Sequence, residues 1–130
     1  MKSLPPAERR RSPRVESCLS LHLTSADFDL AVETKNVSAG GAYCRVDRRL
    51  PFMAKLKVAL LLPIQEGGKT VSHRIRCEAI VVRSESQIVD KGQERHYAAL
   101  YFERMKPSDR LHLERYVRAV LAAHPLVSRR

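Results

Sequence analysis

Arginines and small polar residues form two clusters in the chain whose chemistry suits an anionic ligand. The first cluster, residues 8–14, contains four arginines among its seven residues. Unlike lysine, arginine offers a planar fork of donors that pairs bidentately with phosphate and stacks on rings. The second cluster, residues 36–41, reads Asn-Val-Ser-Ala-Gly-Gly, and such side chains usually mark a turn. The arginines therefore favour nucleotide recognition over a diffuse attraction of negative charge.

No residue pattern in the sequence predicts catalysis or a metal site. The five histidines are scattered without metal-ligand spacing, and no sequence pattern of a Ser-His-Asp relay is present. Gly68-Lys69-Thr70 resembles the end of a phosphate-binding loop, but Pro63 occupies the position of its first glycine. The H-x-E sequence at His112 lacks the Cys-x-x-Cys of the zinc deaminases. We expect a binding module that is not an enzyme and holds no cofactor and no metal.

Positive charge is concentrated towards the two ends of the chain. The formal net charge of the 130 residues is +10, from 24 lysines and arginines against 14 aspartates and glutamates. The excess lies in residues 1–14 and 104–130, whereas residues 15–103 are nearly neutral. A uniformly basic nucleic-acid surface is therefore not expected, and an anion should bind near the ends.

Length and composition predict one globular domain in the cytoplasm. Hydrophobic residues make up 44% and charged residues 29% of the chain, which is too apolar for a wholly disordered protein. The longest apolar run has the length of a strand, and the first residues lack the apolar region of a secretory signal. We therefore expect no membrane insertion. Three cysteines without Cys-x-x-Cys spacing indicate no disulfide framework, and we expect them to be buried.

Alternation of apolar and polar residues predicts six strands followed by one helix. The predicted strands are residues 15–23, 28–35, 42–46, 55–62, 71–84 and 95–103, with a polar loop at 86–94. Apolar residues at helical spacing from Leu113 predict an amphipathic helix whose N-cap is Ser108. The predicted fold class is all-β with one helix: a six-stranded antiparallel β-barrel with a C-terminal amphipathic helix. We expect a flexible tail at residues 1–8, the domain at 9–124 and a basic tail at 125–130.

Taken together, the two polar clusters resemble the motifs of a known family. Residues 10–14 have the pattern R-x-x-x-R, and residues 36–41 have the pattern N-x-S-x-x-G. In this order, and separated by two predicted strands, they resemble the PilZ family, whose pattern is R-x-x-x-R followed by [D/N]-x-S-x-x-G. The resemblance covers roughly residues 9–120, and it includes the six-stranded barrel and the closing helix.

The resemblance implies a receptor for the bacterial second messenger cyclic di-GMP, a dianion with two guanines and two phosphates. Arg10 and Arg14 would pair with phosphate or with a guanine edge. Asn36 stands where many family members have Asp, and it would contact a guanine edge, with Ser38 adding a hydroxyl. The glycines of the second motif would adopt positive φ and approach the ligand closely. The implied ligand-binding residues are Arg9, Arg10, Arg14, Asn36, Ser38, Gly40 and Gly41.

The resemblance leaves the output and two other functions open. We expect ligand binding to order residues 9–14 against the barrel and so to signal to an unidentified downstream protein. One alternative is a single-strand nucleic-acid-binding protein, against which stand the nearly neutral middle and the few aromatic residues. The other alternative is a PilZ-like adaptor that binds only protein, although such members typically lack the two motifs. Asn36 and Ser38 could also serve only to close a turn.

Overall fold

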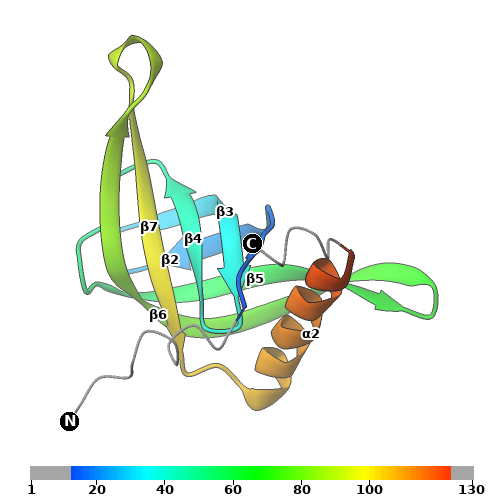
Figure 1. Cartoon of the computed structure of the whole chain (residues 1–130). Helices are drawn as coiled ribbons and strands as arrows, with labels where there is room; N and C mark the ends of the chain where they lie inside the picture. The colour runs from blue at the N-terminus through cyan, green and yellow to red at the C-terminus, as the bar shows by residue number, and fades with distance from the viewer. Residues whose placement is uncertain (1–12, 124–130) are drawn as a thin grey trace, which may run out of the picture.

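A single antiparallel sheet that closes into a ring forms most of the protein (Figure 1). The computed structural model describes residues 13–123. The sheet order is β1-β3-β2-β5-β6-β7-β4, and an additional pairing of β3 with β4 closes the ring. The strands are β1 (Val15–Glu16), β2 (Ser20–Thr24), β3 (Asp29–Ser38), β4 (Gly41–Val46), β5 (Lys55–Glu66), β6 (Lys69–Ile88) and β7 (Glu94–Glu103).

The core fills the inside of the ring with side chains that alternate along each strand. In β5 the buried residues are Leu56, Val58, Leu60 and Leu62, and their neighbours in the chain are exposed or half-buried. The same alternation runs through the middle of β6. A period of two is that of a strand with one face on the core. The alternation predicted from the sequence is therefore confirmed where the ring is regular.

Helix α2 (Pro107–Ala123) packs on one side of the ring, where it contacts β1, β3 and β5 (Figure 1). Leu113 and Val117 are buried in the core, and Tyr116 and two further apolar residues of the helix pack against it. The amphipathic helix is thereby confirmed. Among residues 13–123, no helix is both long and apolar enough to span a membrane.

The prediction of Ser108 as the N-cap of this helix was wrong. The helix already begins at Pro107, one residue before the predicted cap. Proline suits the first helical position because its fixed φ is helical and the amide hydrogen it lacks would have no intrahelical partner there. Asp109 follows in the first turn, where a negative charge is favourable at the positive end of the helix dipole.

The sheet has seven strands where the sequence predicts six, because the first predicted strand is divided. β1 and β2 pair with successive parts of β3, and the ladder is interrupted between them. The buried side chain of Thr34 lies at the interruption: its hydroxyl accepts a hydrogen bond from the Leu19 amide at 2.9 Å and donates to the Ser17 carbonyl. A side-chain hydroxyl thus replaces the backbone partner that a regular ladder would supply.

Strand β6 is longer than predicted and forms two hairpins that project from the ring in different directions (Figure 1). The β5–β6 turn is Gly67–Gly68, and both glycines have positive φ, as tight hairpin turns require. At the other end, most of the predicted loop 86–94 is replaced by strand and by a short 3-10 helix, η1 (Asp90–Gly92). The segment is polar because the tip of this hairpin is exposed, and polarity alone does not distinguish an exposed hairpin from a loop.

Two of the three cysteines are buried and one is exposed. Cys44 and Cys77 are buried as predicted, and burial raises the pKa of each thiol to about 12. Cys18 is exposed, so the prediction was wrong for this residue. It lies in the short segment between β1 and β2, and a hydrogen bond to Glu33 raises the pKa of its thiol.

Truncation of Leu113 tests how α2 is held on the ring. Its side chain is fully buried, so Leu113→Ala should lower the free energy of unfolding by about 2–5 kcal/mol. Leu111 lies on the same helix with 45% of its surface exposed, and Leu111→Ala should change stability by no more than about 0.5 kcal/mol. Urea denaturation of both variants measures the difference. Equal effects would contradict the packing described for α2.

Candidate ligand-binding site

The structure brings one residue from each of the two sequence motifs into direct contact. Arg14, immediately before β1, donates a hydrogen bond from Nη1 to Oδ1 of Asn36 in β3, over 2.6 Å. The contact follows from the pairing of β1 with β3, in which Glu16 lies opposite Asn36. Arg9 and Arg10, the other predicted arginines, lie outside the described residues.

A bulge in β3 places Asn36 on the outer face of the ring, the face that points away from the core. The alternation of Leu30, Val32 and Thr34 predicts that Asn36 points into the core. The register with β4 shifts between Thr34 and Asn36, so that Lys35 is an extra residue. A bulge reverses the facing of the residues that follow it. Asn36 is consequently half-buried and available from outside, and the next residue, Val37, is fully buried.

A second bulge, in β6, places an unpredicted arginine on the same outer face. The alternation of Ile75, Cys77, Ala79 and Val81 would direct residue 83 inward, but the register with β7 shifts between Val81 and Arg83. Val82 is the extra residue, and Arg83 is exposed. Sequence reasoning missed Arg83 because a period-two pattern does not reveal where a bulge interrupts it.

The two bulged strands align the site residues in one row across the ring. Asn36 lies opposite Tyr43 of β4, Tyr43 lies opposite Ala99 of β7, and Ala99 lies opposite Arg83 of β6. The small side chain of Ala99 stands between Tyr43 and Arg83 in this row. We refer to Asn36, Tyr43, Ala99 and Arg83 as the outer row.

Aromatic rings and cations lie against one another beside the outer row. The rings of Tyr43 and Tyr97 are stacked, with centroids 5.5 Å apart and planes 10° from parallel. The Arg83 guanidinium lies 5.7 Å from the centre of the Tyr43 ring, and the Lys35 ammonium lies 5.3 Å from that of Tyr97. Such contacts are favourable because the face of an aromatic ring is negative. They also hold two cations close to a flat apolar surface.

Electrostatics at the site favour a negative ligand. Partial burial, and after it the positive charge of Arg83, lower the pKa of Arg14. Arg83 therefore lies close enough to repel the Arg14 guanidinium, and an anion between the two groups would relieve that repulsion. Arginine nevertheless stays charged at neutral pH.

Glu85 is the acid that partly balances these cations. Its carboxylate accepts a hydrogen bond from the Tyr43 hydroxyl at 2.6 Å and lies 3.3 Å from the Arg83 Nε. Burial first, and this hydrogen bond second, raise the pKa of Tyr43 to about 12. Tyr43 is therefore neutral at physiological pH, and its hydroxyl fixes the position of Glu85.

Residues 38–41 form the turn between β3 and β4 that carries the second motif. The Ser38 hydroxyl is buried, accepts from the Gly40 amide at 3.1 Å and contacts the Gly41 carbonyl at 3.5 Å. The Ala39 carbonyl accepts a hydrogen bond from Arg110 of α2 at 2.7 Å. The side chain of Ser38 is therefore engaged in shaping the turn, as in the turn-closing alternative.

The predicted positive φ of the two glycines of the motif was wrong. Neither Gly40 nor Gly41 has positive φ. A Cβ atom on Gly41 would instead lie 2.2 Å from the Leu100 carbonyl oxygen of β7, so glycine is required there because two backbones approach closely. At Gly40 a Cβ atom would meet only the Ser38 hydroxyl, at 3.9 Å.

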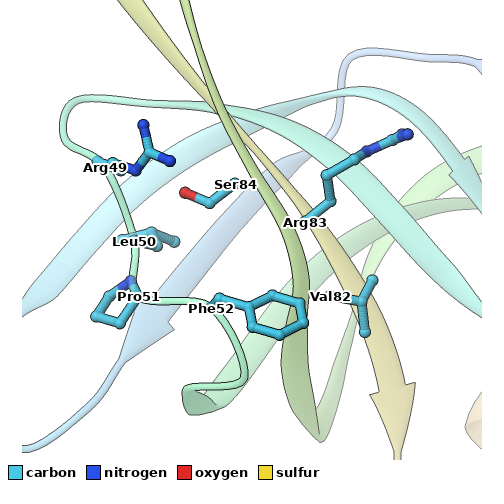
Figure 2. Close-up of a pocket in the computed structure, with 7 residues that line it drawn as sticks. All are labelled: Arg49, Leu50, Pro51, Phe52, Val82, Arg83 and Ser84. Atoms are coloured by element: carbon cyan, nitrogen blue, oxygen red, sulfur yellow. The ribbon is translucent and has the colours of Figure 1, made fainter.

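A shallow depression lies next to the outer row on the other side of β6 (Figure 2). Phe52 and Val82 give it exposed apolar surface. Figure 2 shows the Arg83 side chain extending away from Pro51 and Phe52. The guanidinium of Arg83 thus belongs to the outer row, and only the base of its side chain borders the depression.

Comparison with known protein families identifies the family to which this chain belongs. A family model of the PilZ domain matches residues 8–119. This chain belongs to the PilZ family. The match spans both sequence motifs, every strand and most of α2, so the resemblance inferred from the motifs is confirmed. A search of curated proteins finds no match.

Several solved structures share the fold, and two of those described here are PilZ domains. The inhibitor of motility MotI/DgrA from Bacillus subtilis superimposes with a TM-score of 0.75 and 21% identity, over 94% of this chain and 58% of its own. The PilZ domain of YcgR from Escherichia coli, solved with c-di-GMP, gives a TM-score of 0.62 and 14% identity, over 88% of this chain and 93% of its own. The PilZ domain of CeSA from a cellulose-synthesizing bacterium gives a TM-score of 0.51 and 14% identity, over 82% of this chain and 96% of its own. The chain therefore spans little more than half of the motility inhibitor.

Substitution of Gly41 tests the close approach of β4 to β7 in this PilZ domain. The added Cβ of Gly41→Ala cannot be accommodated unless the strands separate, and we expect a loss of about 1–3 kcal/mol of stability. Gly40→Ala is the matched control, because its Cβ makes only an ordinary contact. Chemical denaturation measures both. If the two variants are equally stable, close backbone approach is not the reason for glycine at position 41.

Proposed function

We propose that this PilZ protein is a receptor for cyclic di-GMP and that the ligand binds on the outer row. The observation that carries the proposal is the contact between Arg14 and Asn36, which joins the two motifs of the family at one point on the surface. Similar structures of YcgR and of MrkH from K. pneumonia were solved with c-di-GMP. Their sequence identity to this chain is 13–14%, so the likeness supports the fold and the residues of this chain support the ligand.

The charges of the site match a dianion. Arg14 immediately precedes β1, and Arg83 of β6 lies close enough to lower its pKa, while Glu85 pairs with Arg83. A phosphate between the two forks would accept bidentate hydrogen bonds and remove the repulsion. In the proposal, Asn36 exchanges its hydrogen bond with Arg14 for the edge of a guanine, whose donors and acceptors an amide complements.

The outer row also offers a surface for a flat base. Ala99 is small and half-buried between Tyr43 and Arg83, so a ring can lie over it. The Arg83 guanidinium already lies against the Tyr43 ring, and the same planar group can stack on a purine. We therefore add Arg83 to the ligand-binding residues proposed from the motifs.

The remaining motif residues act in the proposal through the shape of the β3–β4 turn. Ser38 holds the turn through its contacts with Gly40 and Gly41, and the turn fixes the end of β3 that carries Asn36. Arg9 and Arg10 would complete the cationic side of the site from the segment preceding Arg14. We propose that ligand binding fixes residues 9–14 against the outer row and that a downstream protein recognises the altered surface.

The expected affinity follows from the number of charged contacts. Four charge-assisted hydrogen bonds at about 1.5–3 kcal/mol each supply about 6–12 kcal/mol before the cost of ordering the contacting segment. Micromolar or somewhat tighter binding, about −8 kcal/mol, is then expected.

Titration calorimetry with cyclic di-GMP tests the proposal. Arg14→Ala removes one bidentate fork and should weaken binding about 10- to 100-fold, and Arg10→Ala should do the same. Arg115 is exposed on α2, and Arg115→Ala is the matched control that removes the same charge and should leave the affinity unchanged.

Absence of binding to the wild-type protein would reject the proposal and favour the adaptor that binds only protein. A single-stranded RNA of mixed sequence in the same assay tests the remaining alternative. Binding of RNA that falls by orders of magnitude between low and moderate salt, with no preference for guanine, would identify a polyanion site instead.

Two substitutions at Arg83 test its place in the site. Arg83→Ala should weaken cyclic di-GMP binding about tenfold or more, because both a charge and a stacking surface are lost. Arg83→Lys keeps the charge and loses the planar fork, so its affinity should lie between those of wild type and Arg83→Ala. The same calorimetric titration measures both. Wild-type affinity in Arg83→Ala would exclude this residue from the site while leaving the motif residues in place.

A further inference from the structure

A cluster of three metal-ligating side chains lies where α2 begins, apart from the outer row. His73 of β6 and Asp109 and His112 of α2 each offer one ligand atom, and these atoms all lie within 4.8 Å of one another. His73 Nε2 and Asp109 Oδ1 are 3.3 Å apart, and the two imidazole rings have centroids 4.4 Å apart. The cluster is conspicuous among the described residues because no other three such side chains converge in this way.

The fold brings these residues together from distant parts of the sequence. Asp109 and His112 are three residues apart on α2, and side chains at that spacing project from the same face of a helix. His73 faces them from the part of β6 that pairs with β5. The spacing of histidines along the chain gave no indication of the cluster, because His73 lies in a strand and precedes Asp109 by 36 residues.

Hydrogen bonding within the cluster leaves it incomplete. The His73–Asp109 contact of 3.3 Å is longer than a strong ion-assisted hydrogen bond. Nδ1 of His112 is buried without any hydrogen-bond partner, and leaving such a group unpaired costs free energy. A cation bound at Nδ1 would give this buried nitrogen a partner.

We propose that His73, Asp109 and His112 bind one divalent transition-metal ion of the Zn²⁺ class. Two imidazole nitrogens and one carboxylate oxygen are borderline donors, which suit zinc and its neighbours and not Mg²⁺ or Ca²⁺. Ligand bonds of about 2.0–2.1 Å at tetrahedral angles place two ligand atoms about 3.3 Å apart, which is the His73–Asp109 separation. The three ligand atoms lie within 4.8 Å of one another. The most distant pair therefore needs to approach by no more than about 1.5 Å to reach the separation expected of two tetrahedral ligands.

The cluster is more open to solvent at His73 than at Asp109. His73 has 37% of its side chain exposed, whereas Asp109 has 14%, so the ion can enter from the His73 side and keep a water there. The ion would connect the first turn of α2 to β6. Arg110, next to Asp109, holds the β3–β4 turn through the Ala39 carbonyl, so the proposed ion fixes the end of the helix that supports the turn of the outer row. The metal site does not depend on the identity of the ligand bound there.

Titration of the full chain, without a histidine tag, with Zn²⁺ tests the proposal by calorimetry. We expect one equivalent to bind to the wild-type protein. His112→Ala and Asp109→Asn each remove one of three ligands and should weaken binding at least about tenfold. His22→Ala is the matched control, because His22 pairs with Asp29 in the other histidine–aspartate pair of residues 13–123 and lies outside the cluster. Its affinity for Zn²⁺ should equal that of wild type.

Two further measurements separate a metal site from a loss of folding. Co²⁺ should give the visible absorption of a four- or five-coordinate ion in the wild type and not in Asp109→Asn. The thermal midpoint should rise with Zn²⁺ in the wild type and in His22→Ala, and not in Asp109→Asn. Circular dichroism without metal should be the same for all three proteins; if Asp109→Asn is unfolded, His73→Gln takes its place. Absence of saturable Zn²⁺ binding, or equal binding in His112→Ala and wild type, would overturn the proposal.

Discussion

In the closed ring every strand keeps one face on the core. A side chain that the alternation would direct into the core can therefore lie on the outer face only where a bulge shifts the alternation. Two residues of the proposed site, Asn36 and Arg83, reach that face in this way. Both bulges occur at the same level of the sheet, and two strands separate them. The core is undisturbed because Val37 and Val81 remain buried on either side. Regular pairing is thus interrupted at two positions, and as a result polar side chains lie together on the outer face of the sheet.

The charges at the site follow from the same constraint. A cation cannot point into a core of aliphatic side chains, and the near-neutral middle of the chain contributes one arginine and one lysine to the outer face beside Tyr43 and Tyr97. Arg14 comes to them from a separate part of the sequence because β1 pairs with β3. The result is an accumulation of positive charge beside the half-buried Tyr43 and the buried Tyr97. In the proposed function these cations receive a nucleotide, whereas a long polyanion would need a continuous groove of positive charge.

Helix α2 is linked to the site through its first turn and its middle. Arg110 holds the turn that follows Asn36, and the Tyr116 hydroxyl contacts Ser17 in the segment between β1 and β2. Both strands that meet at the Arg14–Asn36 contact are therefore held by the helix. The cluster of His73, Asp109 and His112 joins the same first turn to β6. A ligand or an ion that changes the position of α2 would consequently act on the geometry of the site.

Local sequence determined much of this protein. Alternation fixed which residues line the core, helical spacing fixed the face of α2 that is buried, and two short motifs indicated the family, because each of these patterns is set by neighbours along the chain. The pairing of Arg14 with Asn36, the outward turn of Arg83, the need for glycine at position 41 and the meeting of His73 with α2 were decided only by the tertiary structure. Each of these depends on which strand lies beside which, and at what register. Register in a closed ring is set by the packing of the whole core, so no single segment of the sequence contains it.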